Sequence, residues 1–178
     1  APPLEGQEFV DYRKSTHCET IVGAGLVMTF PTGEYFEDKL INLGANRYTF
    51  TPQFGVVHTR GKWTMEISSS VTFHTDNDDF FNGRKHEEDP LLIGQGHLIY
   101  TFMPGLWLGA SVGYGYGGES TIDHVSADDR KGNLGFGLSA GIPVTRHFGF
   151  KVAYIGIRTK EDTGSDNDTF TLGCSLQW

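Results

Sequence analysis

A period of two in the apolar residues constrains this chain more than any other feature of its sequence. Eight segments alternate an apolar residue with a small or polar one, and each runs for about 9 to 12 residues. The clearest is 63–74, where Trp, Met, Ile, Val and Phe alternate with Thr, Glu, Ser and His. This alternation indicates β-strands, and no window of useful length favours the helical period. The chain is therefore predicted to be all-β.

Short and long connections alternate between these eight segments. The short ones are breaks of a few residues, whereas the long ones are polar and contain 17 of the chain's 22 Asp and Glu residues. Strands joined in this way predict an antiparallel up-and-down sheet whose long connections gather at one end. The four long connections are 31–46, 75–91, 117–131 and 158–168.

The length of the segments points to a membrane. A tilted membrane-spanning strand needs about 9–11 residues, whereas strands in globular proteins most often have about 5–6. A sheet in lipid must close on itself, because no water is present to satisfy an open edge. An even strand number with short turns and long outer loops is typical of outer-membrane barrels. The sequence predicts such a barrel over 20–178, preceded by a polar segment, 1–19, on the periplasmic side.

The composition agrees with this interpretation. Glycine occurs 24 times and aromatic residues make up 13% of the chain. In a membrane barrel the large apolar residues face lipid, and Gly, Ser and Thr face a narrow interior. A soluble barrel also alternates, but here it would expose a Gly/Ser surface with few charges, which is unusual. The net charge of −8 argues against nucleic acid as a partner.

Aromatic residues are expected to form two belts at the membrane interfaces. One set lies beside the short turns and the other beside the long loops. The predicted belt residues are Trp63, Trp107, Phe148 and Trp178 at the turns, and Tyr48, Tyr114 and Tyr116 at the loops.

Polar residues on the opposite register are expected to line the interior. A charged group there must pair or meet water, so Glu66 is predicted to pair with Lys151 or His97. The lining residues either border a passage or form a polar plug. They are Gln53, Glu66, Gln95, His97, Lys151 and Gln177.

The sequence contains no recognisable catalytic motif and indicates no cofactor. Four acidic loop residues are weak candidates for a divalent metal, although Asp also shapes turns and keeps loops solvated. The two cysteines are Cys18, just before the first predicted strand, and Cys174, near the end of the last one. They either form a disulfide, if those strands are neighbours, or stay unpaired. The metal candidates are Asp76, Asp78, Asp166 and Asp168.

Several long motifs carry a family resemblance. The chain resembles the bacterial outer-membrane family of the MetA pathway of phenol degradation over about residues 20–178. The motifs are PTGEYFEDKLINLGANRYTFTPQFGV (31–56), TDNDDFFNGRKHEEDPL (75–91), YTFMPGLW (100–107), YGGESTIDHVSADDRKGN (116–133) and TGSDNDTFTLG (163–173).

The resemblance implies a Gram-negative outer-membrane β-barrel, in contact with lipid and lipopolysaccharide, that passes small hydrophobic or aromatic compounds. It matches the C-terminal two-thirds of a family member. The barrel therefore closes with the eight visible strands, or has about twelve if upstream sequence is missing. Eight strands leave an interior just filled by side chains, and more can hold a channel. The alternative function is a closed structural or surface-interaction barrel whose acidic outer loops bind a partner or lipopolysaccharide.

Overall fold

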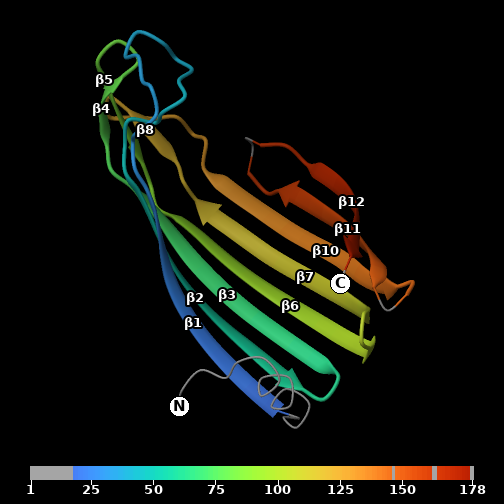
Figure 1. Cartoon of the computed structure of the whole chain (residues 1–178). Helices are drawn as coiled ribbons and strands as arrows, with labels where there is room; N and C mark the ends of the chain where they lie inside the picture. The colour runs from blue at the N-terminus through green and yellow to red at the C-terminus, as the bar shows by residue number, and fades with distance from the viewer. Residues whose placement is uncertain (1–17, 146, 162–163, 177–178) are drawn as a thin grey trace.

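Eight long antiparallel strands form one sheet (Figure 1). The computed structural model describes residues 18–145, 147–161 and 164–176. Each strand pairs with the next long strand along the chain, so the sheet is an up-and-down meander. The strands, in sheet order, are β1 (Cys18–Thr29), β2 (Thr49–Arg60), β3 (Trp63–His74), β6 (Leu91–Met103), β7 (Leu106–Gly117), β10 (Lys131–Pro143), β11 (Phe148–Thr159) and β12 (Asn167–Leu176).

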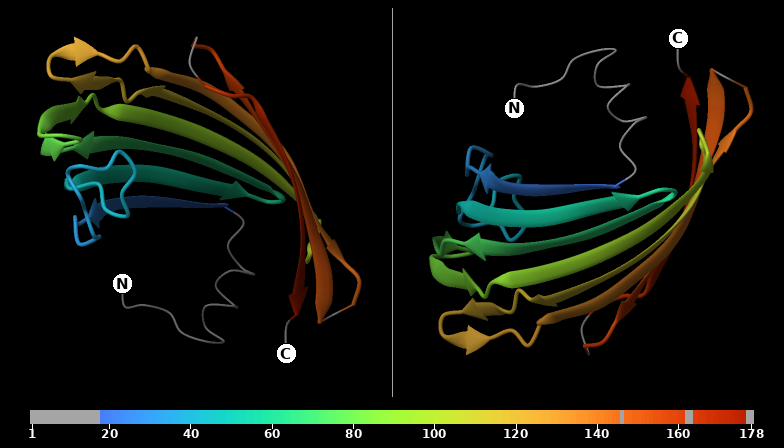
Figure 2. Two further views of the ribbon diagram at one scale, coloured as in Figure 1. Left: turned by 90° about the horizontal axis from the view of Figure 1, so that it is seen from above. Right: turned by 90° about the horizontal axis from the view of Figure 1, so that it is seen from below.

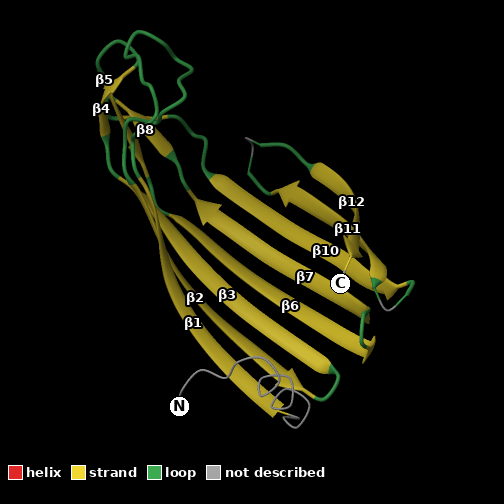
Figure 3. Cartoon of the chain, viewed as in Figure 1, coloured by secondary structure: helices red, strands yellow, loops and turns green. Residues whose placement is uncertain are grey.

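The predicted all-β antiparallel fold is confirmed. Figure 3 shows strands and loops only, and the described residues include no helix long and apolar enough to cross a membrane. Two of the short turns are closed by glycine in the left-handed region, Gly61 with φ 60° and Gly105 with φ 83°. A residue with a Cβ is strained there, so these glycines make the tight connections between β2 and β3 and between β6 and β7.

The long connections hold a second, small sheet that the sequence did not predict. It has four strands and lies beyond one end of the large sheet (Figure 1). Its strands have two to five residues, too few for an alternating pattern to be recognised. They are β4 (Asn77–Phe80), β5 (Arg84–Glu88), β8 (Ser120–Ile122) and β9 (Val125–Ser126). The pairing of β5 with β8 joins the 75–91 and 117–131 connections.

The register of the large sheet separates two chemically different faces. Gln95, Gly113 and Gly135 pair in one row across three strands, and Ser68 extends that row onto β3. We call the face that carries this row the small-residue face, because Gly, Ser and Thr dominate it. Large apolar side chains alternate with it on the opposite, apolar face.

The apolar face is not covered by anything in the structure. No hydrophobic residue is buried among the described residues, and Ile67 and Leu172 are 70% and 73% exposed. A soluble protein of this size would bury such residues in a core. A continuous apolar face of this extent matches the hydrocarbon interior of a membrane.

The sheet is strongly curved, with β1 and β12 at its two edges (Figure 2). The pairs formed by the described residues join each long strand to its neighbours but do not join β1 to β12. The eight strands therefore form a curved wall, and the outer backbone groups of β1 and β12 remain for other partners.

Pro52 lies within β2 without changing its register. The β2–β3 pairs Phe50–Phe73 and Gln53–Ser70 follow one alignment on either side of it, while Pro52 pairs with Leu26 on β1. The missing N–H is therefore absorbed by a local gap in one ladder rather than by a bulge.

The two cysteines provide a test of this arrangement. Cys18 and Cys174 are free and lie on the two edge strands, β1 and β12. A disulfide requires Cα atoms within about 7 Å. We therefore expect that mild oxidation of the folded protein forms no intramolecular disulfide. Both thiols should still react with a maleimide afterwards, and mass spectrometry counts the labels. A rapid and complete disulfide would show instead that β1 and β12 are direct neighbours.

Candidate functional site

The small-residue face is hollowed in three places. The hollows have volumes of about 490, 790 and 320 Å³ and lie over different strands of the sheet. Gly, Ser and Thr leave space that larger side chains would occupy. The apolar face has a more open hollow of about 510 Å³ between its large side chains, lined by residues such as Leu138 and Phe170, and this hollow faces the side that matches lipid. The small-residue face is therefore the candidate lining of a passage.

The described lining candidates all lie on this face. Gln53, Glu66, Gln95, His97 and Lys151 share it by register, in rows that run across the paired strands. Gln177 lies outside the described residues. The role of these residues as a channel lining or a plug stays a prediction.

The predicted ion pair of Glu66 is wrong. Glu66 lies directly opposite His97 in the register, but the His97 ring nitrogen Nδ1 is hydrogen-bonded to the Ser111 hydroxyl at 2.8 Å. Lys151 lies on β11, four strands away from β3. Within the described part of the chain Glu66 has no ion pair. Its carboxylate is therefore left to the open space in front of the face.

Trp107 also differs from the sequence prediction. It lies on the small-residue face, whereas the outward belt residues lie on the apolar face. The indole covers Gly141, its partner on β10, so closely that a Cβ added to Gly141 would lie 2.2 Å from Nε1. The absence of a side chain at Gly141 thus makes room for the ring. On the apolar face, Phe136 covers Gly156 in the same way, with a 2.6 Å approach.

Other aromatic residues gather at both ends of the strands. Near the short turns, Trp63 contacts Tyr100 with ring centroids 4.8 Å apart, and Phe148 contacts Phe150 at the same distance. Near the long loops, Tyr48 contacts Phe30, and Tyr114 stacks on Tyr116 at 6.4 Å. Trp178 lies outside the described residues.

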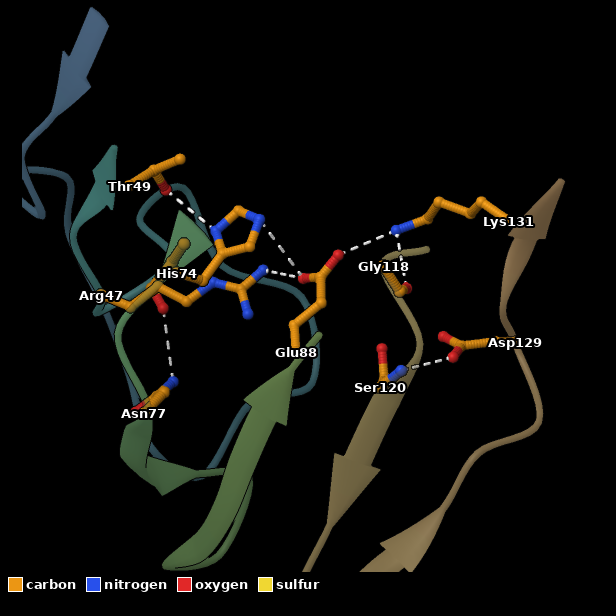
Figure 4. Close-up of polar contacts among 10 residues, drawn as sticks. Arg47, Thr49, His74, Asn77, Glu88, Gly118, Ser120, Asp129 and Lys131 are labelled. Atoms are coloured by element: carbon orange, nitrogen blue, oxygen red, sulfur yellow. Dashed lines mark hydrogen bonds and ion pairs between the residues drawn. The ribbon is translucent and has the colours of Figure 1, made fainter. Parts of the chain in front are cut away.

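A buried carboxylate connects the long connections at the other end of the wall (Figure 4). Glu88 accepts hydrogen bonds from Arg47 and, at 2.8 Å, from the Lys131 ammonium. The His74 ring nitrogen Nε2 lies 3.8 Å from the same carboxylate, whose side chain is only 8% exposed. We call these four residues the Glu88 cluster. It joins the end of the 31–46 connection to β3, β5 and β10.

The electrostatics of the cluster favour the charged carboxylate. Burial by itself would raise the pKa of the Glu88 carboxyl, but hydrogen bonds and charge from Lys131 and Arg47 outweigh it and lower the pKa from its ordinary value of 4.5. A lowered pKa in the folded state means that the cluster contributes its stability fully above pH 4.5. This contribution is lost as the pH falls through the folded-state pKa.

A buried asparagine fixes the first long connection to the small sheet. Asn77 is 2% exposed. Its side-chain oxygen accepts a hydrogen bond from Asn46 at 3.0 Å, and its nitrogen donates to the Tyr35 hydroxyl at 2.9 Å. The sequence predicted only solvated turns here. No local pattern marks Asn77 or Glu88, because their partners lie about 30 to 40 residues away in the chain.

The metal candidates are engaged mainly by cations and backbone groups. Asp76 pairs with Lys85 at 2.7 Å, and Asp168 pairs with Arg158 at 2.8 Å. Asp166 lies 3.9 Å from the same Arg158 and accepts a hydrogen bond from the Thr159 backbone, and Asp78 lies on β4. Across residues 18–145, 147–161 and 164–176, no group of three or more His, Cys, Asp or Glu residues is placed to hold a metal ion. The hypothesis of a metal site therefore has no geometric support.

The exposed apolar face, the hollowed opposite face and the meander topology together define the fold class of a transmembrane β-barrel wall. The chain belongs to the family described as "Putative MetA-pathway of phenol degradation", whose model matches residues 20–176. It is similar to the crystal structure of the COG4313 outer membrane channel from Pseudomonas putida F1, with a TM-score of 0.70 and 30% identity. The match covers 86% of this chain and 57% of that chain, so this chain spans little more than half of that channel. No curated protein matches the chain.

The contact between Trp107 and Gly141 predicts a coupled pair of substitutions. Gly141→Ala places a methyl group against the indole and should lower the free energy of unfolding by about 1–3 kcal/mol. Trp107→Ala in the same chain should recover much of this loss. Urea unfolding in lipid vesicles, followed by circular dichroism, measures both. Gly25→Ala is the control, because a Cβ there meets nothing within 4 Å. Equal stability of Gly141→Ala and the unsubstituted protein would contradict the packing.

The Glu88 cluster predicts a local loss of order. Glu88→Gln leaves the Arg47 and Lys131 cations facing each other without a carboxylate, at a local cost of about 3 kcal/mol. Backbone hydrogen exchange at 84–91 and 117–131 should accelerate at pH 7. In the unsubstituted protein these segments should lose protection, after correction for intrinsic exchange, only below the ordinary carboxyl pKa of 4.5.

Glu87→Gln is the matched control for this experiment. Glu87 pairs with Lys85 at 2.7 Å in a more exposed setting, where an ion pair contributes little. Equal exchange in the two variants would show that Glu88 does not hold the loops.

Proposed function

We propose that this chain forms part of the wall of an outer-membrane channel, and that small hydrophobic or aromatic compounds pass it by passive diffusion. The observation that carries the proposal is the hollowed small-residue face. It lies opposite an exposed apolar face that is suited to contact with lipid, so that a molecule beside the small-residue face would be within the membrane but separated from lipid by the sheet.

The charges on that face suit weakly polar solutes. Along the described strands its Asp, Glu, Lys and Arg residues are Glu19, Glu66, Lys131 and Lys151. They lie on four different strands, and between them the surface is mostly Gly, Ser, Thr and aliphatic side chains, with a few neutral polar or aromatic residues such as Gln95, His97 and Trp107. Such a surface offers a solute occasional hydrogen bonds without the ring of like charge that selects ions. In this proposal the protein carries no catalytic residue.

The open edges bear on how the channel is completed. In lipid, the unpaired backbone groups of β1 and β12 must be satisfied. Eight strands closing directly on each other would leave an interior filled by side chains. The separation of β1 from β12 in Figure 2 favours a wider barrel in which further strands pair with both edges. This is also the arrangement in which the three hollows remain open.

A second candidate function involves the outer loops. The 31–46 connection exposes Ile41 by 88% and Leu43 by 89%, although Asn42 between them fixes the loop through three hydrogen bonds to Phe36 and Lys39. An ordered loop with exposed aliphatic side chains is suited to binding a partner or the lipid part of lipopolysaccharide.

Transport assays separate the two candidates. In planar bilayers the purified full-length protein should give stepwise single-channel conductance. In vesicles that contain lipopolysaccharide, which slows spontaneous crossing, it should accelerate entry of 4-nitrophenol relative to protein-free vesicles. A large dextran should stay excluded in both. Absence of conductance steps together with unchanged nitrophenol entry would overturn the channel and leave the loop surface as the better explanation.

A further inference from the structure

We propose that the hollow over β6, β7, β10 and β11 is a binding site for a small, planar, neutral aromatic molecule with one hydroxyl group, such as a phenol. This inference rests on the proposed channel function and locates the solute within it. The hollow has a volume of about 490 Å³, which is ample for a single aromatic ring.

The floor of the hollow is made by glycines. Gly113 of β7 pairs with Gly135 of β10, and Gly115 and Gly137 lie diagonally next to this pair, opposite Asn133 and Ser111, all on the small-residue face. Where Cβ atoms are missing, a flat ring can approach the backbone closely and can contact it over more of its area than a puckered ring of the same size can.

Two of these glycines are not required by the fold. A Cβ added to Gly115 or Gly135 would have its nearest neighbour at 3.7 or 3.8 Å, which is ordinary van der Waals contact. Neither residue has a positive φ. Larger residues would therefore fit the sheet at both positions, and what glycine provides there is the open space of the hollow.

The walls of the hollow combine apolar side chains with polar ones, among them Asn133 beside the glycine floor. Ile93 of β6 faces Ile155 and Ile157 of β11 across the glycine floor. Apolar residues on two sides of a flat floor bury the edges of a ring.

Hydrogen-bonding groups lie next to these walls. Gln95 and His97 are the next lining residues of β6. The His97 nitrogen Nδ1 is bonded to Ser111, and no hydrogen bond is found for its Nε2 or for the Gln95 amide among the described residues. An aromatic hydroxyl can bond to either group while its ring stays on the glycines.

The charge of the hollow favours a neutral ligand over an anion. Lys131 is the only lining residue with a permanent charge, and its ammonium is bound to Glu88 at 2.8 Å and to the Gly118 carbonyl oxygen at 3.2 Å. A carboxylate in the hollow would lose its hydration without gaining a free cation. A phenol has no such cost.

The test compares matched substitutions on the two faces of the sheet. Gly135→Val fills the hollow, whereas Gly94→Val makes the same change on the apolar face of β6, where a Cβ meets nothing within 4 Å. Binding of phenol to the full-length protein in detergent is measured by saturation-transfer NMR titration. The unsubstituted protein and Gly94→Val should bind phenol alike, and Gly135→Val should raise the Kd about tenfold or more. Cyclohexanol and benzoate should bind more weakly than phenol.

The outcomes are separable from those of the transport assay. Equal phenol binding by Gly135→Val and Gly94→Val would overturn the site, even if nitrophenol transport is intact. Stronger binding of benzoate or cyclohexanol would overturn the ligand class. If phenol binding depends on Gly135 but the protein transports no nitrophenol, the binding site is supported and the channel function is rejected. The heat-dependent mobility of Gly135→Val on gels shows whether it folds. If it does not fold, Gly115→Ala replaces it and should likewise weaken phenol binding relative to Gly94→Val.

Discussion

The structure depends on one constraint: every backbone N–H and C=O within the membrane must find its partner on a neighbouring strand. The long strands meet it through continuous antiparallel ladders, from Cys18–Arg60 at one end of the sheet to Phe148–Leu176 at the other. Pro52 has no backbone N–H to donate. The effect is confined to a gap in the β2–β3 ladder, and the register on both sides of the gap is unchanged. The same constraint gives β1 and β12 their importance. They are the only long strands with one unpaired side among the described residues, so the way they are satisfied decides how wide the finished barrel is.

Because the backbone is satisfied by the ladders, the side chains are free to differ completely between the two faces. The apolar face needs only to match acyl chains, and it uses large residues whose rings cover gaps, as Phe136 does over Gly156. The small-residue face uses glycine in two distinct ways. Gly141 receives the indole of Trp107, so glycine there is a packing requirement. No side chain packs closely over Gly115 or Gly135, and in the proposed site the space above them is occupied by the solute.

The sequence predicted the large sheet well, because alternation and connection length are local properties of the chain. The eight long strands, the two faces and the four long connections follow from residues that are neighbours in sequence, as in Trp63–His74. Interactions between distant connections could not be predicted this way. The Glu88 cluster and the Asn77 contacts join residues far apart, and acidic loops give no sign of which carboxylate is buried. Trp107 was predicted as a belt residue because it lies beside a turn. Its place in the strand register puts it on the small-residue face, where Gly141 on β10 leaves room for the ring.

Lys131 connects the two parts of the site. Its strand position places it at the loop end of the hollow, while its ammonium is held by Glu88, and Glu88 is held in turn by Arg47. The cluster therefore does more than fasten the long connections. By pairing the only permanent cation of the hollow, the Glu88 carboxylate keeps the adjoining surface neutral, which is the condition for a neutral aromatic solute to be preferred over its carboxylate counterpart. Because the lowered pKa of Glu88 keeps that carboxylate charged well into the acidic range, the pairing is insensitive to pH near neutrality. In the proposed site, selectivity in the hollow therefore depends on the same carboxylate that orders the loops.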